Sequence, residues 1–340
     1  AFVGVSFRMV STYLAIKYKP SDISSPSFAT PMAYLESQIK GTGKRLSNIV
    51  AMLILIQGLV TANLIQSNSV AHALQGRFLF SKFTVALLLT LLVGMVIIGG
   101  LQKIVHWSSI IAPVMHVMYV VIGLFILIAS PVRTLHALGS VFLYAFTPYS
   151  FAGGVAGYAV LQAMQFGVAR GVFSHGSGTG LCPFFQGANR DHPSVGAFMS
   201  SITPVIDTVT VCTITGLVIL SGSYWPLENG AYLTALTFSS KIGEFGNVLI
   251  VCCLSVFAFT TIITNANFAE RCFRYLGFQD IGSFRIFFLA VTFIGPFFPV
   301  IFVWSLGDVL TGLLVFLHLI PMTYIMLTHL KIIKNDLVNY

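Results

Sequence analysis

The chain has 340 residues, of which 56% are hydrophobic and only 8% are charged, and its mean hydropathy is +0.90. A soluble domain of this size needs far more charge on its surface, so the composition predicts an integral membrane protein. The formal net charge of +8 does not indicate nucleic-acid binding, because the basic residues stand in short loops between apolar stretches.

Apolar stretches close to the roughly 20 residues that a helix needs to cross a bilayer recur along the whole chain. They predict one all-helical transmembrane domain, residues 1–340, without a soluble module. The nine expected membrane segments are residues 1–16, 46–70, 83–104, 107–130, 158–190, 195–220, 247–268, 284–304 and 309–330. The first is short for a full crossing. The second carries four amide side chains, which need partners inside hydrocarbon: Gln57, Asn63, Gln66 and Asn68.

The segment 138–157 decides the topology of everything that follows it. If it dips or lies on the outer face without crossing, the loops on one side hold twelve basic residues and those on the other hold four. Cytoplasmic loops carry an excess of Lys and Arg. The bias therefore predicts that the richer side is cytoplasmic and that the C-terminus lies there.

The segment 158–190 is predicted to be a broken helix. Between Ser174 and Gly180 it holds three glycines in seven residues, a poor helix-forming composition. Unwound backbone at membrane depth is tolerated only where it is buried in protein or lines a cavity, and transporters bind substrate and ions at such breaks. The alternative is a glycine-rich loop between two helical hairpins.

Four ionisable residues stand inside or beside the apolar segments. A charged side chain at membrane depth costs free energy, so such residues indicate a functional role. Asp207 lies near the middle of its segment and is expected to be either a structural acceptor or part of the transport machinery. Asp308 is expected to be an interfacial or helix-start carboxylate. The basic candidates are Arg8 and Arg170.

Polar groups near the middle of other segments suggest an ion site. Thr260 and Thr261 are adjacent hydroxyls, and oxygen ligands suit hard cations, although threonine in a membrane helix usually bonds back to its own helix. His175 stands in the break, where a hydrogen-bonding or proton-linked role is open. The sequence shows no phosphate loop, nucleophile elbow or metal-ligand spacing. A secondary transporter is therefore favoured over a channel and over a membrane enzyme or scaffold.

Five stretches together carry a family resemblance. Residues 170–183 read Arg-Gly-Val-Phe-Ser-His-Gly-Ser-Gly-Thr-Gly-Leu-Cys-Pro, and the others are Pro31-Met-Ala-Tyr-Leu-Glu36, Gln66-Ser-Asn-Ser69, Ile206-Asp-Thr-Val-Thr-Val-Cys-Thr213 and Phe257-Ala-Phe-Thr-Thr-Ile262. In order and spacing they resemble the motifs of the alanine or glycine:cation symporter family. That family's break motif reads approximately Arg-Gly-Leu-Phe-Ser-Asn-Glu-Ala-Gly-Met-Gly-Ser-Ala-Pro. The resemblance covers the whole chain.

The resemblance implies the LeuT-like fold of two inverted five-helix repeats, with the first helix of the fold outside residues 1–340. It implies a multi-pass protein of the bacterial inner membrane that imports a small neutral amino acid with co-transported sodium by alternating access. No enzyme activity, nucleic acid or obligate protein partner is expected. The residues expected to line the amino acid are Gln66, Phe173, Ser174, His175, Gly178, Thr179, Gly180, Ile262 and Asn265. Thr260 and Thr261 are expected to bind sodium, and Asp207 and Arg170 to have structural or coupling roles.

Four positions of the expected pocket depart from the family's pattern. His175 and Gly176 stand where the family has Asn and Glu, Thr179 where it has Met, and Asn265 where it has Trp. Losing an indole and a thioether predicts a larger, more polar cavity that selects bigger or more polar neutral amino acids. The rival hypothesis is an inactive, decayed fragment of such a transporter.

Overall fold

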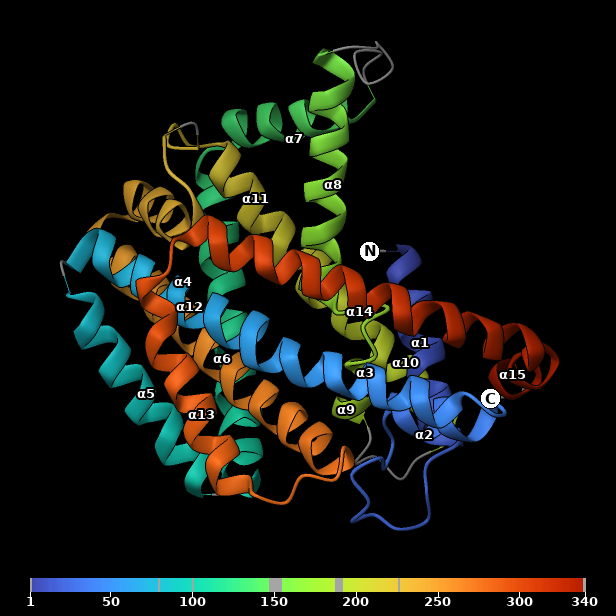
Figure 1. The fold of residues 1–340 in the computed structure, drawn as a ribbon. Helices are drawn as coiled ribbons and strands as arrows, with labels where there is room; N and C mark the ends of the chain where they lie inside the picture. The colour runs from blue at the N-terminus through green and yellow to red at the C-terminus, as the bar shows by residue number, and fades with distance from the viewer. Residues whose placement is uncertain are drawn as a thin grey trace.

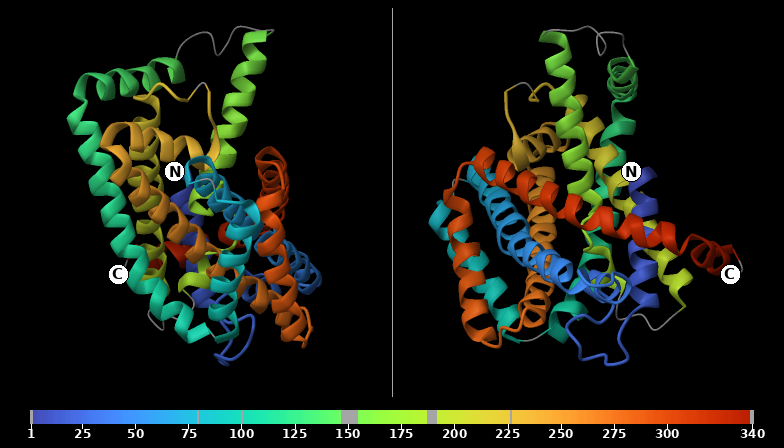
Figure 2. Two further views of the ribbon diagram at one scale, coloured as in Figure 1. Left: turned by 90° about the vertical axis from the view of Figure 1, so that its left-hand side faces the viewer. Right: turned by 45° about the vertical axis from the view of Figure 1, so that its right-hand side comes forward.

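The computed structural model describes residues 2–78, 80–99, 101–146, 155–186, 192–225 and 227–338. Every regular element in these ranges is a helix, as the sequence predicted, and the helices pack into one bundle (Figures 1 and 2). The elements are α1 (Phe2–Lys17), α2 (Pro31–Gln38), α3 (Gly43–Gln57), η1 (Gly58–Ala62), α4 (Asn63–Phe78), α5 (Lys82–Gly99), α6 (Leu101–Ala129), α7 (Pro131–Phe146), α8 (Val155–His175), α9 (Cys182–Gln186), α10 (Pro193–Pro204), η3 (Val205–Cys212), α11 (Thr213–Leu220), α12 (Gly230–Tyr275), α13 (Ile281–Ile294), η4 (Gly295–Phe297), α14 (Val300–Thr328) and α15 (Leu330–Val338).

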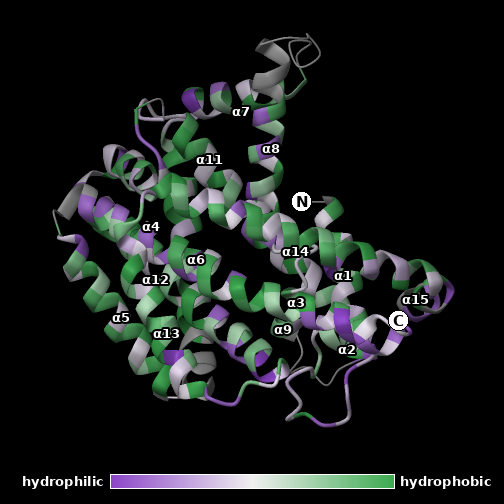
Figure 3. Cartoon of the chain, in the orientation of Figure 1, coloured by the Kyte–Doolittle hydropathy of each residue, from purple (hydrophilic) through white to green (hydrophobic). Residues whose placement is uncertain are grey.

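Six helical stretches of the described chain are long and apolar enough to cross a membrane. They are Gly43–Gln75, Lys82–Gly99, Ile110–Ala129, Pro193–Leu220, Gly230–Tyr275 and Val300–Thr328. Hydrophobic residues run along most helices of the bundle (Figure 3), and many large apolar side chains are exposed, which suits a lipid solvent. The protein is therefore a multi-spanning membrane protein. The count of nine segments and the side on which the C-terminus lies stay predictions.

The break between the last two predicted segments lies at a different position in the structure. The stretch from α13 through η4 ends at Phe297, and α14 begins at Val300, whereas the sequence placed this break after residue 304. Pro296 and Pro299 explain the difference, because proline has no N–H to continue a helical ladder, its ring disrupts a helix interior, and it is favoured at a helix start.

The segment 138–157 is described only in part. Helix α7 ends at Phe146 and α8 begins at Val155, and residues 147–154 between them lie outside the described chain. Figures 1 and 2 show α7 running across the direction of α6 and α8 rather than alongside them. Whether this segment crosses the membrane stays a prediction.

Two amides of the second predicted segment, those of Asn63 and Asn68, find partners on neighbouring elements. Asn63 Nδ2 donates to the carbonyl of Phe288 at 2.9 Å, and Asn63 Oδ1 accepts from Thr292 Oγ1 at 2.8 Å. Asn68 Nδ2 donates to the carbonyls of Gly295 and Phe298 at 3.0 and 2.8 Å. These bonds tie α4 to α13 and η4, so the amide load is structural at these two positions.

The C-terminal helix α15 docks on α1 and α10. Lys17 Nζ lies 2.7 Å from Asp336 Oδ2, and Ser194 Oγ donates to the Asp336 carbonyl at 2.7 Å. Hydrogen bonds from Lys17 and then from Tyr13 hold the pKa of the Asp336 carboxyl below its ordinary value.

The π-helical turn η1 holds a buried hydroxyl that makes no hydrogen bond within the described chain. Thr61 is 1% exposed, and its Oγ1 has no partner there. Replacing an unsatisfied buried hydroxyl by an apolar group of the same shape removes a desolvation cost of about 1 kcal/mol. We expect Thr61→Val to raise the melting temperature of the detergent-purified protein.

Thr292→Val is the matched control, because the Thr292 hydroxyl donates to the buried Asn63 amide oxygen and to the Phe288 carbonyl. We expect Thr292→Val to lower the free energy of unfolding by about 1 kcal/mol or more, because it leaves buried acceptors unpaired. A lower melting temperature for Thr61→Val would contradict the prediction.

Candidate functional site

A turn with three glycines at positive φ separates α8 from α9. Helix α8 ends at His175, and we call residues 176–181 the glycine turn. Within it Gly176, Gly178 and Gly180 have φ values of 58°, 80° and 76°. Side chains with a Cβ are strained in this region, whereas glycine adopts it freely. The three glycines therefore explain why the helix stops inside the stretch that the sequence marked.

The positive φ values do not test whether α8 and α9 are two halves of one membrane-crossing helix. The second half was predicted to run to residue 190, and residues 187–191 lie outside the described chain. The broken membrane helix therefore stays a prediction.

A buried arginine closes the end of α8. Arg8 is 6% exposed, its Nη1 donates to the carbonyl of His175 at 2.5 Å, and its Nε donates to the carbonyl of Ser200 at 2.9 Å. The last carbonyls of a helix have no partner within the helix and carry partial negative charge. Arg8 satisfies one of them and joins α1, α8 and α10 at a single point.

Most residues of the glycine turn are buried: Ser177 is 4% exposed and Thr179 is 1% exposed. Thr179 Oγ1 donates to the carbonyl of Gly176 at 2.6 Å, and His318 Nδ1 of α14 contacts the carbonyl of Gly178 at 2.7 Å. A Cβ on Gly180 would lie 3.1 Å from both His318 Nε2 and Pro31 Cγ. The predicted site residues from 175 to 180 are thus brought together, and they are covered by α1, α2 and α14.

A separate cavity of about 530 Å³ brings together other predicted residues. It lies between α4, α8, α12 and α14, and its lining includes Gln66, Arg170 and Thr261 together with Phe257 and Trp304. Asn68 of the same helix also lines the cavity, although its amide donates to the backbone carbonyls of Gly295 and Phe298, whereas Asn63 is not among the lining residues. An amide, a guanidinium and a hydroxyl facing one volume can bind a small zwitterion.

Arg170 forms an ion pair beside this cavity. Its Nη2 donates to Asp308 Oδ2 at 2.6 Å, and its guanidinium carbon lies 4.1 Å from the ring centre of Trp304. Phe173 packs against the same indole, with ring centres 5.1 Å apart. Of the two expectations for Asp308, the helix-start carboxylate is therefore wrong, and the interfacial carboxylate stays a prediction. Pro299 moves the start of α14 back to Val300, which leaves Asp308 inside the helix.

The two predicted sodium ligands bond back to their own helix. The hydroxyls of Thr260 and Thr261 both donate to the carbonyl of Phe257, at 3.0 and 2.8 Å. A hydroxyl that donates its proton keeps its lone pairs, so both oxygens remain able to coordinate a cation. Only Thr261 lines the cavity.

Neither Ile262 nor Asn265 is among the residues that line the cavity. Ile262 has no exposed surface and belongs to the main hydrophobic core. Asn265 Nδ2 donates to the carbonyl of Thr261 at 2.9 Å, and its backbone packs against Gly58 of η1. The structure does not bring these two residues together with Gln66, and their substrate role stays a prediction.

Asp207 belongs to the π-helical element η3, and Ser174 contacts other residues of the same element. The Asp207 carboxylate lies 3.2 Å from His116 Nε2 of α6. The next residue, Thr208, shares a hydrogen bond of 3.0 Å with Ser174 at the end of α8. Wide π turns of this kind are frequent at functional sites because they re-aim side chains within a helix.

Sequence reasoning missed the partners His116 and His318. Neither stands at ligand spacing from another residue, which is why neither was singled out. The signal that could have found them is the presence of an ionisable ring inside an apolar segment.

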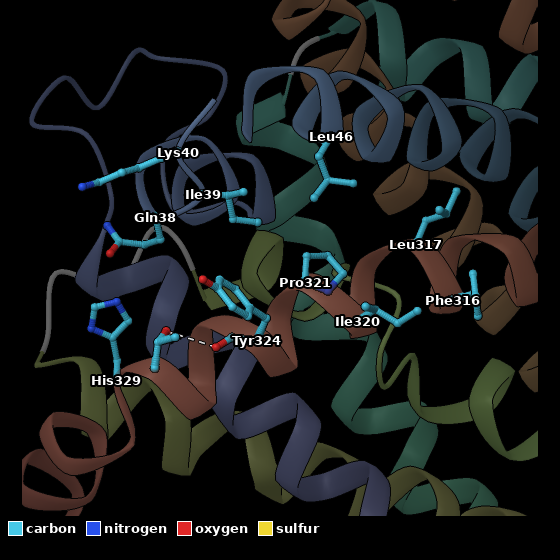
Figure 4. Close-up of a pocket in the computed structure, with 11 residues that line it drawn as sticks. Gln38, Ile39, Lys40, Leu46, Phe316, Leu317, Ile320, Pro321, Tyr324 and His329 are labelled. Atoms are coloured by element: carbon cyan, nitrogen blue, oxygen red, sulfur yellow. Dashed lines mark hydrogen bonds between the residues drawn. The ribbon is translucent and has the colours of Figure 1, made fainter. Parts of the chain in front are cut away.

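A larger cavity of about 820 Å³ opens between the end of α2, the start of α3 and the second half of α14. Figure 4 shows Ile39 and Leu46 on one side of it and Pro321 and Tyr324 on the other. It is lined by none of the predicted site residues. The smaller cavity, between Gln66, Arg170 and Thr261, is therefore the candidate site.

These features define a helical membrane protein with a polar-lined cavity among its spanning helices. The chain belongs to the sodium:alanine symporter family, whose model matches residues 1–338. The predicted family is thereby confirmed, and the protein is a membrane transporter rather than an enzyme.

Three relatives illustrate the match. The chain is 33% identical over 329 residues to the sodium/alanine symporter AgcS of Methanococcus maripaludis, covering 94% of this chain and 72% of that protein. It is 32% identical over 329 residues to an uncharacterized transporter of Haemophilus influenzae, covering 95% and 72%. It is 30% identical over 326 residues to the probable sodium/glutamine symporter GlnT of Bacillus subtilis, covering 94% and 66%.

Proposed function

We propose that the protein is a sodium-coupled symporter that imports a small neutral amino acid by alternating access. The observation that carries the proposal is the family match over residues 1–338. The cavity supports it, because Gln66, Arg170 and Thr261 reach one volume from three different helices. We extend the proposal to a LeuT-like fold in a bacterial inner membrane, with a cytoplasmic C-terminus.

In this proposal the amino acid lies between α4 and the end of α8. The amide oxygen of Gln66 accepts a hydrogen bond from the substrate ammonium, and donors of the broken segment meet the carboxylate. Thr260 and Thr261 supply hydroxyl oxygens to sodium, with backbone carbonyls completing the shell. The charges of the cargo are thus met by polar groups of the protein inside the bundle, where an unsolvated charge without partners is costly.

A carrier for a larger or more polar amino acid is the second candidate. One observation favours it: one relative is named as a probable sodium/glutamine symporter. Competition for the uptake of radiolabelled alanine separates the two candidates. Stronger inhibition by unlabelled glutamine than by unlabelled alanine would favour the carrier for a larger or more polar amino acid.

The test is uptake of radiolabelled alanine into proteoliposomes with and without an inward sodium gradient. The proposal expects accumulation that depends on the gradient and is reduced by unlabelled alanine, glycine or glutamine. Uptake that is equal with sodium and with potassium would contradict sodium coupling, and the absence of uptake of any neutral amino acid would contradict the transport assignment.

The sodium site gives a prediction of its own. Thr261→Ala removes one oxygen that faces the cavity, and we expect the sodium concentration for half-maximal uptake to rise about tenfold, which corresponds to ~1.4 kcal/mol. Thr237→Ala is the matched control, because Thr237 of α12 also bonds back to its own helix and is buried outside the cavity. An unchanged sodium dependence in Thr261→Ala would exclude this hydroxyl as a ligand.

A further inference from the structure

A buried histidine of α14 connects the glycine turn to α2. His318 has no exposed surface. Its Nδ1 lies 2.7 Å from the carbonyl of Gly178, and its Nε2 is hydrogen-bonded to the hydroxyl of Tyr34. The Tyr34 hydroxyl is in turn 3.2 Å from Ser11 Oγ of α1. Four elements of the fold therefore meet in one chain of hydrogen bonds.

The chemistry of these groups sets the direction of every bond. A carbonyl can only accept, so Nδ1 of His318 carries a proton and donates to Gly178. None of the ion pairs found in the described chain includes His318, and an uncompensated charge on a ring without exposed surface is costly, so the ring is neutral. Its Nε2 is then an acceptor, Tyr34 donates to it, and the Tyr34 oxygen accepts from Ser11.

The turn is packed directly onto α14 at this point. A Cβ on Gly178 would lie 3.4 Å from Val315 and 3.8 Å from Leu319, which flank His318 on the same helix. A Cβ on Gly180 would lie 3.1 Å from His318 Nε2. The close approach lets the Gly178 carbonyl reach the imidazole, and it leaves no room for water between them.

The same helix also contacts the candidate site. Asp308 and Trp304 of α14 hold the guanidinium of Arg170, which lines the cavity. Ten residues separate Asp308 from His318, which is about 15 Å along a helix. Helix α14 therefore contacts two places: α8 beside the cavity, through Asp308, and the glycine turn, through His318.

We propose that His318 is a positioning residue of the transport site, which fixes the Gly178 peptide through its Nδ1–H and thereby sets the orientation of the glycine turn relative to α14. The inference rests on the proposed function and deepens it. Any movement of the turn away from α14 during transport must break this bond, and the end of α8, with Phe173 and Ser174, moves with the turn.

The decisive comparison is between two amides at position 318. In His318→Asn the side-chain amide donor takes the place of Nδ1 and can still bond to Gly178. In His318→Gln the amide reaches the position of Nε2 and loses that bond. Tyr34→Phe is the matched control on the other side, because it removes the partner of Nε2 and leaves the donor to Gly178 in place.

Two measurements on the full chain read out the effect. The first is hydrogen–deuterium exchange of peptides covering residues 176–181 in detergent, which does not depend on transport. The second is the alanine concentration for half-maximal uptake, measured with the maximal rate. We expect His318→Gln to raise both the exchange rate of the turn and the half-saturating alanine concentration about tenfold. His318→Asn and Tyr34→Phe are expected to stay within about twofold of the unchanged protein.

Each outcome decides the inference. Equal exchange rates in His318→Gln and His318→Asn, with both proteins folded, would overturn it. A lower melting temperature of His318→Gln, with no change in the exchange rate of residues 176–181 or in the half-saturating alanine concentration, would also overturn the inference. It would leave His318 with a purely structural role. If the unchanged protein transports no neutral amino acid, the proposed function fails, and the exchange measurement still tests whether His318 positions the turn.

Discussion

Arg8→Met is expected to destabilise the protein by about 4 kcal/mol, the largest effect of any single substitution that we predict for stability. The Arg8 guanidinium is buried and donates to two backbone carbonyls, those of His175 and Ser200. A hydrogen bond from a charged group contributes about 1.5–3 kcal/mol, and methionine would fill the space while leaving both carbonyls without a donor. The measurement is thermal or denaturant unfolding of the purified protein in detergent.

Two controls interpret the Arg8 result. Arg8→Lys keeps the charge, but one ammonium lacks the forked geometry that reaches both carbonyls, so we expect about half of the loss. Arg133→Met replaces an exposed arginine of α7 and is expected to leave stability unchanged. A melting temperature of Arg8→Met equal to that of Arg133→Met would show that the two carbonyl bonds do not stabilise the fold.

Gly180→Ala is expected to have the largest effect on transport. The residue has a φ of 76°, where a Cβ costs about 1–2 kcal/mol, and the new methyl group would press against His318 and Pro31 at 3.1 Å. Because the turn is held between α2 and α14, it cannot relax away from both. We expect the rate of sodium-driven alanine uptake to fall about tenfold or more, which corresponds to ~1.4 kcal/mol or more.

Two glycines serve as matched controls for Gly180. Gly277 has a φ of 93°, and no atom lies within 4 Å of the place that a Cβ would take there, so Gly277→Ala isolates backbone strain from steric contact. Gly216 of α11 is helical and equally open, so Gly216→Ala is expected to be neutral or slightly stabilising. Uptake by Gly180→Ala at the level of Gly277→Ala would mean that the contacts with α2 and α14 are unimportant.

The local features of the chain were predictable because they depend on short stretches of sequence. Apolar runs predicted helices, three closely spaced glycines predicted the end of α8, and the amides of α4 were expected to need partners, which Asn63 and Asn68 have. The end of α13 was misplaced because hydropathy continues smoothly through Phe297 and Phe298, and only Pro296 and Pro299 interrupt the backbone ladder there.

The candidate site was predictable only in part. The motifs pointed to Gln66, Arg170 and Thr261, which share a cavity, but they grouped Ile262 and Asn265 with them. Adjacent residues of a helix face different directions, so a motif read along the chain cannot separate the side chain that faces a cavity from its buried neighbour.

By itself, then, the sequence determined that this is an all-helical, multi-spanning membrane protein of the sodium:alanine symporter family, with a helix that ends at a glycine turn. Hydropathy, glycine content and motif order are properties of the chain alone. Only the tertiary structure decided which polar groups meet: Arg8 with Ser200, Arg170 with Asp308, and His318 with Gly178. These pairs are 192, 138 and 140 residues apart along the chain. Their contacts follow from how helices pack, and lipid-facing and protein-facing surfaces are similarly apolar in a membrane, so the sequence pattern carries little information about that packing.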